Sequence, residues 1–527
     1  MNSAPEKPSL PIWMLVALYA VMTAVTLYPL AVIEIPSFGD YLNHLARMYI
    51  LTHYDHSNTF QIYYTIQWRA IPYLALEGIF LVLNLFLPIY SAGRVVLGLC
   101  VLLPVISVAM LHYAIHRRRS AVPLAAFLIS YNHVLAWGFL NQLLTMCLAV
   151  MAFAGWIATR RWHRWARAGL FSALALILYF CHLVGFGMYG LMLVGYELGR
   201  TWQARGRPWR DIVGDWTAVA AQALVPLLLT IMVPLDRGYV TAVHTEYGGL
   251  ISRVIALLSP VLVFGGPTDL LTFVVAAGIL LALLALRFVR LAPLVWAPTL
   301  TVATLATAAP QLLQGTWGTS FRLPVLLAML LLAGFSTTGR VNPVIRGVVL
   351  VPMLMIAAVH TLGLLPLLRT LDEDIATIRG LISIMPPGQR MLVAETLLDD
   401  QTVHHGPEFP TWHMNMVSVI DRETYNPLLF MAPSVIKASA AMPAPVPIGG
   451  HPITLYQLRQ GLGRDAIDDH DDDGQGGQHY WFGWEAKYNY LLIEHFGAPL
   501  QDLPVNLKLV SSSTIANLYQ IVKPDGR

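Results

Sequence analysis

The sequence carries few charges. Asp, Glu, Lys and Arg make up 12% of its 527 residues, whereas a soluble domain carries about 25%. This shortage excludes an ordinary soluble domain. With a mean hydropathy of +0.59, it predicts a polytopic membrane protein. The formal net charge is +3, which gives no reason to expect nucleic acid as a partner.

Cysteine and the common catalytic motifs are also scarce. The three cysteines, Cys100, Cys147 and Cys181, lie inside apolar stretches and are interpreted as small core residues. Their spacing forms neither a disulfide framework nor a metal-ligand pattern. The sequence contains no Walker loop, no G-x-S-x-G elbow and no H-E-x-x-H motif, and we expect no cofactor.

Long apolar segments fill the first two thirds of the chain. A membrane-spanning helix needs about 20 residues, with about 17 as the usual lower limit. Two apolar segments, 73–89 and 252–266, are ambiguous, so we expect about 11–13 transmembrane helices. The other apolar segments lie at about 12–34, 94–113, 121–136, 140–158, 168–182, 184–199, 213–234, 269–286, 291–309, 323–338 and 346–364.

Basic residues gather in alternate loops, and such loops usually face the cytoplasm. The opposite loops, and everything after residue 365, are then external. If the loop after the first helix is external and the Arg117 loop is cytoplasmic, an odd number of helices must cross the membrane between them. The sequence has two apolar segments there, 73–89 and 94–113, so one of the two does not cross fully. By the same count, 252–266 is re-entrant or lies along the surface. The opposite orientation stays open, because the N-terminal flank carries only Lys7 against Glu6. The basic loops begin at Arg117, Arg160, Arg200, Arg287 and Arg340.

The composition divides the chain into two parts. Residues 1–365 are predicted to form the transmembrane domain, with a first external loop at 35–72. Residues 366–527 have shorter apolar runs and more turn residues, which is typical of a small α/β domain. We predict an amphipathic helix at 370–384 and strands at 389–394, 488–493 and 515–522.

The most distinctive polar segment is Gly39–Tyr49, which reads GDYLNHLARMY and follows the first apolar segment. Asp40, His44 and Arg47 are spaced by four and three residues, so on a helix they share one face. A carboxylate, an imidazole and a guanidinium on one face can take a proton and hold a phosphate. The structural alternative is that Asp40 caps a helix and the other two face solvent or lipid headgroups.

Further polar residues fall in the other predicted external loops. His133, Asn141 and His182 either form hydrogen bonds between helices or line a polar cavity that opens outward. Arg322, at the start of an apolar helix, is either an interfacial arginine or a phosphate anchor. Arg69 and Arg237 have the same two interpretations.

Metal binding has little support. Residues 469–474 match the first half of a calcium loop, but the twelfth position, which should be acidic, is Tyr480. We interpret this segment as a solvated acidic loop, with calcium as a minor alternative. The pairs 399–400 (Asp-Asp) and 404–405 (His-His) could bind a metal, but nothing fixes their geometry, and no metal site is predicted.

Several motifs resemble those of bacterial multi-pass proteins of the GT-C class of membrane glycosyltransferases. They are Asp40–Arg47 (DYLNHLAR), Trp137–Asn141 (WGFLN) and Arg322–Pro324 (RLP). The resemblance implies a GT-C-like fold in a bacterial inner membrane, with an external C-terminal α/β domain. It also implies transfer of a sugar from a polyprenyl-phosphate donor to a lipid or glycan acceptor at the outer face, among membrane lipids.

By position, the resemblance places the general base at Asp40. His44 then either orients Asp40 or acts as an alternative base. The motif has one acid rather than a pair, which argues against metal dependence. The residues expected to hold the phosphate and the substrate are Arg47, Arg69, Arg322, His133, Asn141 and His182.

Two rival functions remain. The first is a transporter or flippase of a lipid-linked or polyanionic substrate. Inverted repeats and broken helices would favour it, but the sequence has no clear internal symmetry. A polymerase or ligase of lipid-linked glycans would need a larger external loop with several arginines, but the 236–252 loop is short and carries only Arg237.

Overall fold

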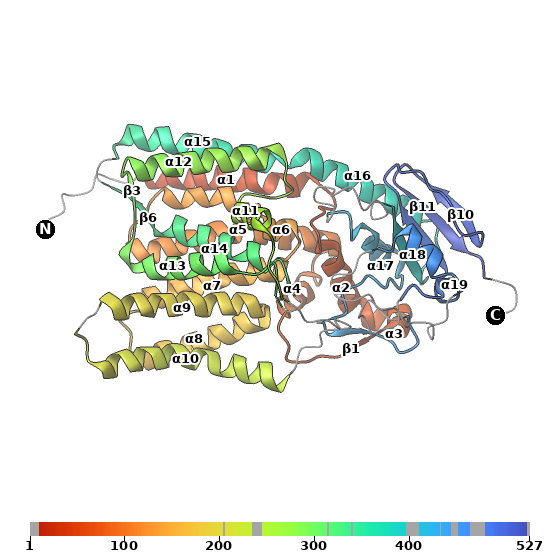
Figure 1. Cartoon of the computed structure of the whole chain (residues 1–527), viewed down its shortest axis with the longest axis horizontal. Helices are drawn as coiled ribbons and strands as arrows, with labels where there is room; N and C mark the ends of the chain where they lie inside the picture. Colours follow the sequence, from red (N-terminus) through yellow and green to blue (C-terminus); the bar gives the residue numbers. More distant parts are fainter. Residues whose placement is uncertain are drawn as a thin grey trace.

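The computed structural model places a long helical bundle beside a smaller mixed domain (Figure 1). It describes residues 10–203, 206–233, 245–313, 316–338, 341–396, 410–432, 434–443, 452–463 and 480–523. The acidic loop at 469–474, the pairs 399–400 and 404–405, and Arg237 lie outside these residues.

All eleven predicted apolar segments are helical, wholly or in part. Within the described residues, seven helical stretches are long and apolar enough to cross a membrane, and shorter apolar stretches lie at 122–136, 293–308 and 319–334. The chain is thus a polytopic helical protein. The bundle consists of α1 (Ile12–Val32), α5 (Ile89–His116), η2 (Val122–Ile129), α6 (His133–Ala136), α7 (Leu140–Ala158), α8 (Arg164–Cys181), α9 (Leu183–Gln203), α10 (Trp209–Met232), α12 (Pro267–Ala285), η3 (Pro293–Val295), α13 (Trp296–Ala308), α14 (Thr319–Gly334) and α15 (Pro343–Gly363).

The segment at 121–136 differs from the continuous spanning helix that its composition suggests. It consists of the 3-10 helix η2 followed by the single turn α6. A 3-10 helix rises about 2.0 Å per residue, so the eight residues of η2 cover about 16 Å. Its residues from Pro123 to Ile129 are all buried, which explains why the stretch is apolar on every side.

The two ambiguous segments do not cross. They form α4 (Ala75–Leu83) and α11 (Leu250–Leu258), each of nine residues. At about 1.5 Å per residue, each covers about 14 Å, less than half of a ~30 Å hydrocarbon core. Of the two segments before Arg117 that the count of crossings left open, 73–89 is therefore too short to span, whereas 94–113 lies within the long helix α5. The segment 252–266 is too short as well.

The basic loops gather at one end of the bundle, the end where α1 begins (Figure 1). Arg117 there donates to the Ala158 carbonyl at 2.9 Å. Strands β3 (Val289–Leu291) and β6 (Phe335–Thr337) pair antiparallel at this end. The Gly39–Tyr49 segment lies at the opposite end, beside the smaller domain, as the alternation of loop charges predicts.

The smaller domain contains a four-stranded sheet with the order β10-β11-β9-β7. β7 is parallel to β9, and the other pairs are antiparallel. The predicted strands and the amphipathic helix are confirmed, and β10 was not anticipated. The elements are α16 (Leu365–Ile382), β7 (Met391–Glu395), η4 (Met414–Met416), α17 (Val417–Arg422), β8 (Ile436–Ala438), α18 (Leu455–Gln460), α19 (Trp484–Lys487), β9 (Tyr490–Glu494), β10 (Leu507–Ser512) and β11 (Ala516–Ile521).

The first loop is interlocked with this domain. It forms α2 (Tyr41–His53), η1 (Tyr54–His56), α3 (Asn58–Tyr63) and β1 (Tyr64–Ile66), and β1 pairs antiparallel with β8. The Ser37 hydroxyl donates to the Pro410 carbonyl at 2.6 Å. The backbone N–H groups of Glu34 and Ile35 donate to the two carboxylate oxygens of Asp372 at 3.0 and 2.9 Å. Residues far apart in sequence therefore meet around Asp40.

Candidate functional site

Asp40 is positioned by a close crossing of two backbone segments. Its N–H donates to the Trp137 carbonyl at 3.0 Å. A Cβ on Gly39 would lie 2.4 Å from that carbonyl oxygen, and a Cβ on Gly138 would lie 2.5 Å from the Asp40 nitrogen. Gly138 also has a φ of +71°, which side chains other than glycine rarely adopt. Glycine is therefore required on both sides of the crossing.

Gly138→Ala is expected to lower the free energy of unfolding by about 1–3 kcal/mol, because the added Cβ meets backbone and the φ is strained. The same displacement moves Asp40, so activity should fall as well. Thermal unfolding in detergent measures the first effect. The matched control is Gly190→Ala, because nothing lies within 4 Å of a Cβ at this α9 position. Equal stability of the two variants would show that the crossing is not tight.

The Asp40 side chain does not cap α2. No side-chain cap hydrogen bond forms at this helix start, so the simple capping alternative is wrong. The side chain is 21% exposed, and its Oδ1 lies 3.5 Å from Nε2 of His413. His413 belongs to the smaller domain and is buried. A partly exposed carboxylate with a donor behind it is arranged to accept a proton from solvent or substrate.

His44 lies next to Arg47 on α2 and close to His413. Its Nδ1 is 3.4 Å from a terminal nitrogen of Arg47, and its ring packs edge-on against Phe430. Burial, together with the nearby Arg47 guanidinium and the His413 ring, lowers the pKa of His44 to about 3. The ring is therefore neutral at physiological pH and does not act as a cation.

Arg47 is turned away from Asp40 and toward α4. Its guanidinium donates to Glu77 at 2.6 Å, with the two side chains 5% and 2% exposed. Burial lowers the pKa of Arg47 and raises the pKa of Glu77, while each charge opposes the shift of the other. The ion pair compensates the charge of the guanidinium, although its Nε, like that of Arg322, has no hydrogen-bond partner among the described residues.

Arg322 is buried on the first turn of α14. It donates to the Trp317 carbonyl at 2.7 Å and lies over the Phe139 ring at 4.6 Å. It interacts electrostatically with Asp40 and Tyr73. Its Nε has no hydrogen-bond partner among the described residues. Arg322 thus has no carboxylate in hydrogen-bond contact there and keeps an unused donor near Asp40.

His182 joins this group at the junction of α8 and α9. Its Nδ1 accepts from the Val184 N–H at 3.1 Å, and its ring packs edge-on against Tyr73. It interacts electrostatically with Arg322 and His44. Because Nδ1 is an acceptor, the neutral ring carries its proton on Nε2, which is left as a donor.

The remaining predicted residues support the surrounding structure. His133 uses both ring nitrogens, one toward the Val263 carbonyl at 3.3 Å and one as acceptor from the Trp137 indole at 3.0 Å. The Asn141 amide oxygen accepts from the Leu76 N–H in the first turn of α4 at 3.3 Å. Arg69 lies partly exposed in the loop between β1 and α4.

Aromatic rings surround the arginine. Trp137 and Phe139 each stack on Phe321, with centroids 6.1 and 6.0 Å apart. The Trp137 ring also contacts Trp317 at 6.3 Å and Trp412 at 6.1 Å. Trp317 is 39% exposed. The buried Arg322, which lies over the Phe139 ring, is therefore packed against a cluster of aromatic rings.

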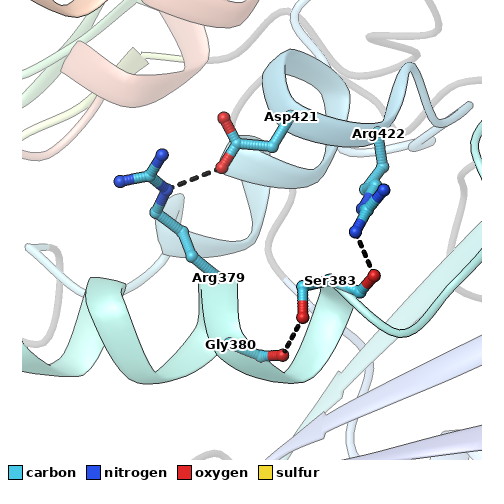
Figure 2. Close-up of a pocket in the computed structure, with 5 residues that line it drawn as sticks. All are labelled: Arg379, Gly380, Ser383, Asp421 and Arg422. Carbon is cyan, nitrogen blue, oxygen red and sulfur yellow. Dashed lines mark hydrogen bonds and ion pairs between the residues drawn. The ribbon is translucent and has the colours of Figure 1, made fainter.

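A separate hollow of about 540 Å³ lies between α16 and α17 (Figure 2). Its cations are already engaged: Arg379 contacts Asp421 at 2.6 Å, and Arg422 donates to the Ser383 carbonyl. None of its lining residues belongs to the Asp40 group. The hollow is therefore not the candidate site. Within the described residues, no cluster of three His, Cys, Asp or Glu side chains is placed to hold a metal ion.

The chain is a multi-pass helical membrane protein with a C-terminal sheet domain. No family model and no curated protein sequence matches the chain. Among solved structures, ArnT from Cupriavidus metallidurans in the apo state is similar, with 13% identity, a TM-score of 0.51, and coverage of 96% of this chain and 98% of that one. At this identity, the likeness shows the fold.

Two further solved structures resemble the chain. ArnT from Cupriavidus metallidurans bound to undecaprenyl phosphate has 13% identity and a TM-score of 0.49, with coverage of 96% of this chain and 98% of that one. The arabinofuranosyltransferase AftD from Mycobacteria has 14% identity and a TM-score of 0.47. That match covers 100% of this chain and 41% of the AftD chain.

Proposed function

We propose that the protein is a glycosyltransferase that moves a sugar from a polyprenyl-phosphate donor to a hydroxyl acceptor at the outer face of the membrane. One observation carries the proposal. A partly exposed carboxylate, Asp40, is fixed at the end of a membrane bundle and interacts electrostatically with the buried Arg322, whose Nε has no hydrogen-bond partner among the described residues. That pair combines a proton acceptor with a phosphate anchor. The GT-C fold agrees with it as an analogy.

The reaction is a single displacement. The acceptor oxygen attacks the anomeric carbon of the donor while Asp40 takes the hydroxyl proton. The bond between the anomeric carbon and the phosphate oxygen breaks, and the electron pair leaves with polyprenyl phosphate. Arg322 stabilises the negative charge that develops on that oxygen. Inversion at the anomeric carbon follows from the single step.

The membrane side is inferred from the loops. The basic loops lie at the end opposite Asp40 (Figure 1), and positive loops usually face the cytoplasm. The Asp40 site and the smaller domain would then be external, in a bacterial inner membrane. The short helix α11 has several exposed apolar side chains, among them Leu250 and Ile251. They support a position along the membrane surface at the same end.

Arg322 is proposed as the main phosphate ligand, in place of Arg47. Arg322→Gln is expected to raise the KM for the lipid donor by about 10–100-fold, because hydrogen bonds to charged groups contribute about 1.5–3 kcal/mol. Arg322→Lys keeps the charge but loses the planar two-donor geometry, so its KM should be intermediate. Donor titrations with purified enzyme measure both.

The control for this series is Arg253→Gln, an exposed arginine on α11 that donates to the Thr307 carbonyl. It should leave the KM for the donor unchanged. If Arg253→Gln raised the KM as much as Arg322→Gln, the rise would come from the loss of a positive charge anywhere near the site. Arg322 would then not be a specific phosphate ligand.

The decisive experiment uses purified protein in liposomes with radiolabelled polyprenyl-phosphate pentose and hexose donors. Transfer predicts release of polyprenyl phosphate together with label on an acceptor. Movement of intact donor between leaflets without cleavage would identify a flippase instead. Elongation only from lipid-linked oligosaccharides would identify a polymerase or ligase.

A further inference from the structure

The Asp40 carboxylate has a partner that the sequence pattern does not indicate. His413 lies just before η4 in the smaller domain and is 2% exposed. Its Nε2 is 3.5 Å from Asp40 Oδ1, and its Nδ1 is 3.2 Å from the Asn43 amide nitrogen. One imidazole thus bridges two residues of the first loop. The bridge spans 370 positions of sequence.

The hydrogen bonds around Asn43 fix which way its amide points. Its oxygen accepts from the Phe430 N–H at 2.8 Å, and its nitrogen donates to the Leu428 carbonyl at 2.7 Å. If the amide were reversed, its oxygen would face the Leu428 carbonyl oxygen and its NH2 group would face the Phe430 N–H, and neither pair can form a hydrogen bond. The group that faces His413 is therefore an NH2, which only donates.

The tautomer of His413 follows from this. Because Asn43 donates to Nδ1, that nitrogen must be an acceptor, and the proton of the neutral ring lies on Nε2. Nε2–H is then the ring donor that lies 3.5 Å from Asp40 Oδ1. The ring cannot turn freely, since its edge packs against Phe430 with centroids 5.0 Å apart.

We propose that His413 is a positioning residue for Asp40, held by Asn43 in the Nε2–H tautomer, so that the C-terminal domain completes the site. Donation to Oδ1 directs Oδ2 outward, where it can accept the proton of the acceptor hydroxyl. The 3.5 Å separation is longer than an ordinary hydrogen bond, and such contacts often tighten when substrate binds. The catalytic meaning of this arrangement rests on the proposed function, whereas the tautomer does not.

The activity test compares three substitutions of His413. The amide nitrogen of His413→Gln reaches about the position of Nε2 and keeps a donor for Asp40, whereas His413→Asn reaches only the Nδ1 position. His413→Phe keeps the ring packing against Phe430. We expect kcat to fall by about 10²-fold in the Asn and Phe variants, the cost of a misplaced catalytic group, with KM unchanged. His413→Gln should recover most of the rate. A loss of the same size in all three variants, or in none, overturns the proposal.

An independent measurement decides the tautomer without activity. Protein labelled with ¹⁵N-histidine gives ring nitrogen spectra, and subtraction of the His413→Gln spectrum assigns His413. The Nε2–H form is expected in the wild-type protein. Asn43→Asp replaces the donor with an acceptor and should move the proton to Nδ1. An Nδ1–H form in the wild-type protein overturns the proposal even if glycosyl transfer is found.

The two failures are distinguishable. If no donor is turned over but the spectra show the Nε2–H form and its loss in Asn43→Asp, the proposed function is wrong and the arrangement around Asp40 is right. Thermal unfolding of each variant checks that His413→Asn and His413→Gln fold equally well. The comparison of these two decides the activity test even if His413→Phe does not fold.

Discussion

Asp40→Asn is expected to reduce glycosyl transfer by about 10²–10⁴-fold, the usual contribution of a general base. The amide has the shape of the carboxylate but cannot take the acceptor's proton. Its oxygen can still accept from His413, and no cap hydrogen bond of α2 depends on it. The variant should therefore fold and reach the membrane like the wild-type protein. Initial rates at saturating donor and acceptor measure the effect, with membrane abundance measured in parallel.

The matched control is Asp55→Asn, the same change at an exposed residue of the same loop. It should leave the rate unchanged. Wild-type turnover in Asp40→Asn would exclude Asp40 as the base and leave His44 as the alternative. Equal losses in both variants would point to a disturbed loop rather than to lost proton transfer.

Much of this arrangement follows from local signals. Apolar length located the eleven helical segments. The count of crossings narrowed the non-crossing segment before Arg117 to 73–89 or 94–113, and the structure shows that 73–89 contains the short helix α4. Such features are written in neighbouring residues. The sheet was only partly anticipated: β10 (Leu507–Ser512) is mostly exposed and lacks a regular alternation of buried and exposed positions, so no periodic pattern marks it.

The site was harder to predict because its contacts join distant parts of the chain. The sequence predicted Asp40 and Arg322 as candidate site residues but gave no partner for Asp40 or Arg47. His413 stands in a loop with no motif of its own. For Arg47 a signal was present: Glu77 is a lone acid in the apolar segment 73–89, and such a residue needs a partner. The spacing of Asp40, His44 and Arg47 placed them near one face without indicating that Arg47 turns to α4.

The Arg47–Glu77 pair should have the largest effect on stability. Arg47→Met is expected to lower the free energy of unfolding by about 3–5 kcal/mol, because it leaves Glu77 charged and buried without a counter-ion. The double variant Arg47→Met/Glu77→Leu removes both charges and should recover most of the loss, since buried ion pairs are often replaced by apolar residues at little net cost. Unfolding in detergent, followed by tryptophan fluorescence, measures both.

An exposed ion pair provides the control. Glu34 contacts Arg379 at 3.0 Å with side chains 71% and 33% exposed, so Glu34→Gln should change stability by less than about 1 kcal/mol.

The sequence pattern alone had suggested that Arg47 binds phosphate. If so, Arg47→Met would raise the KM for the donor, and adding Glu77→Leu would not restore it. Recovery of stability together with an unchanged KM would instead establish that Arg47 anchors α2 to α4. That anchor would hold the helix that begins directly after Asp40.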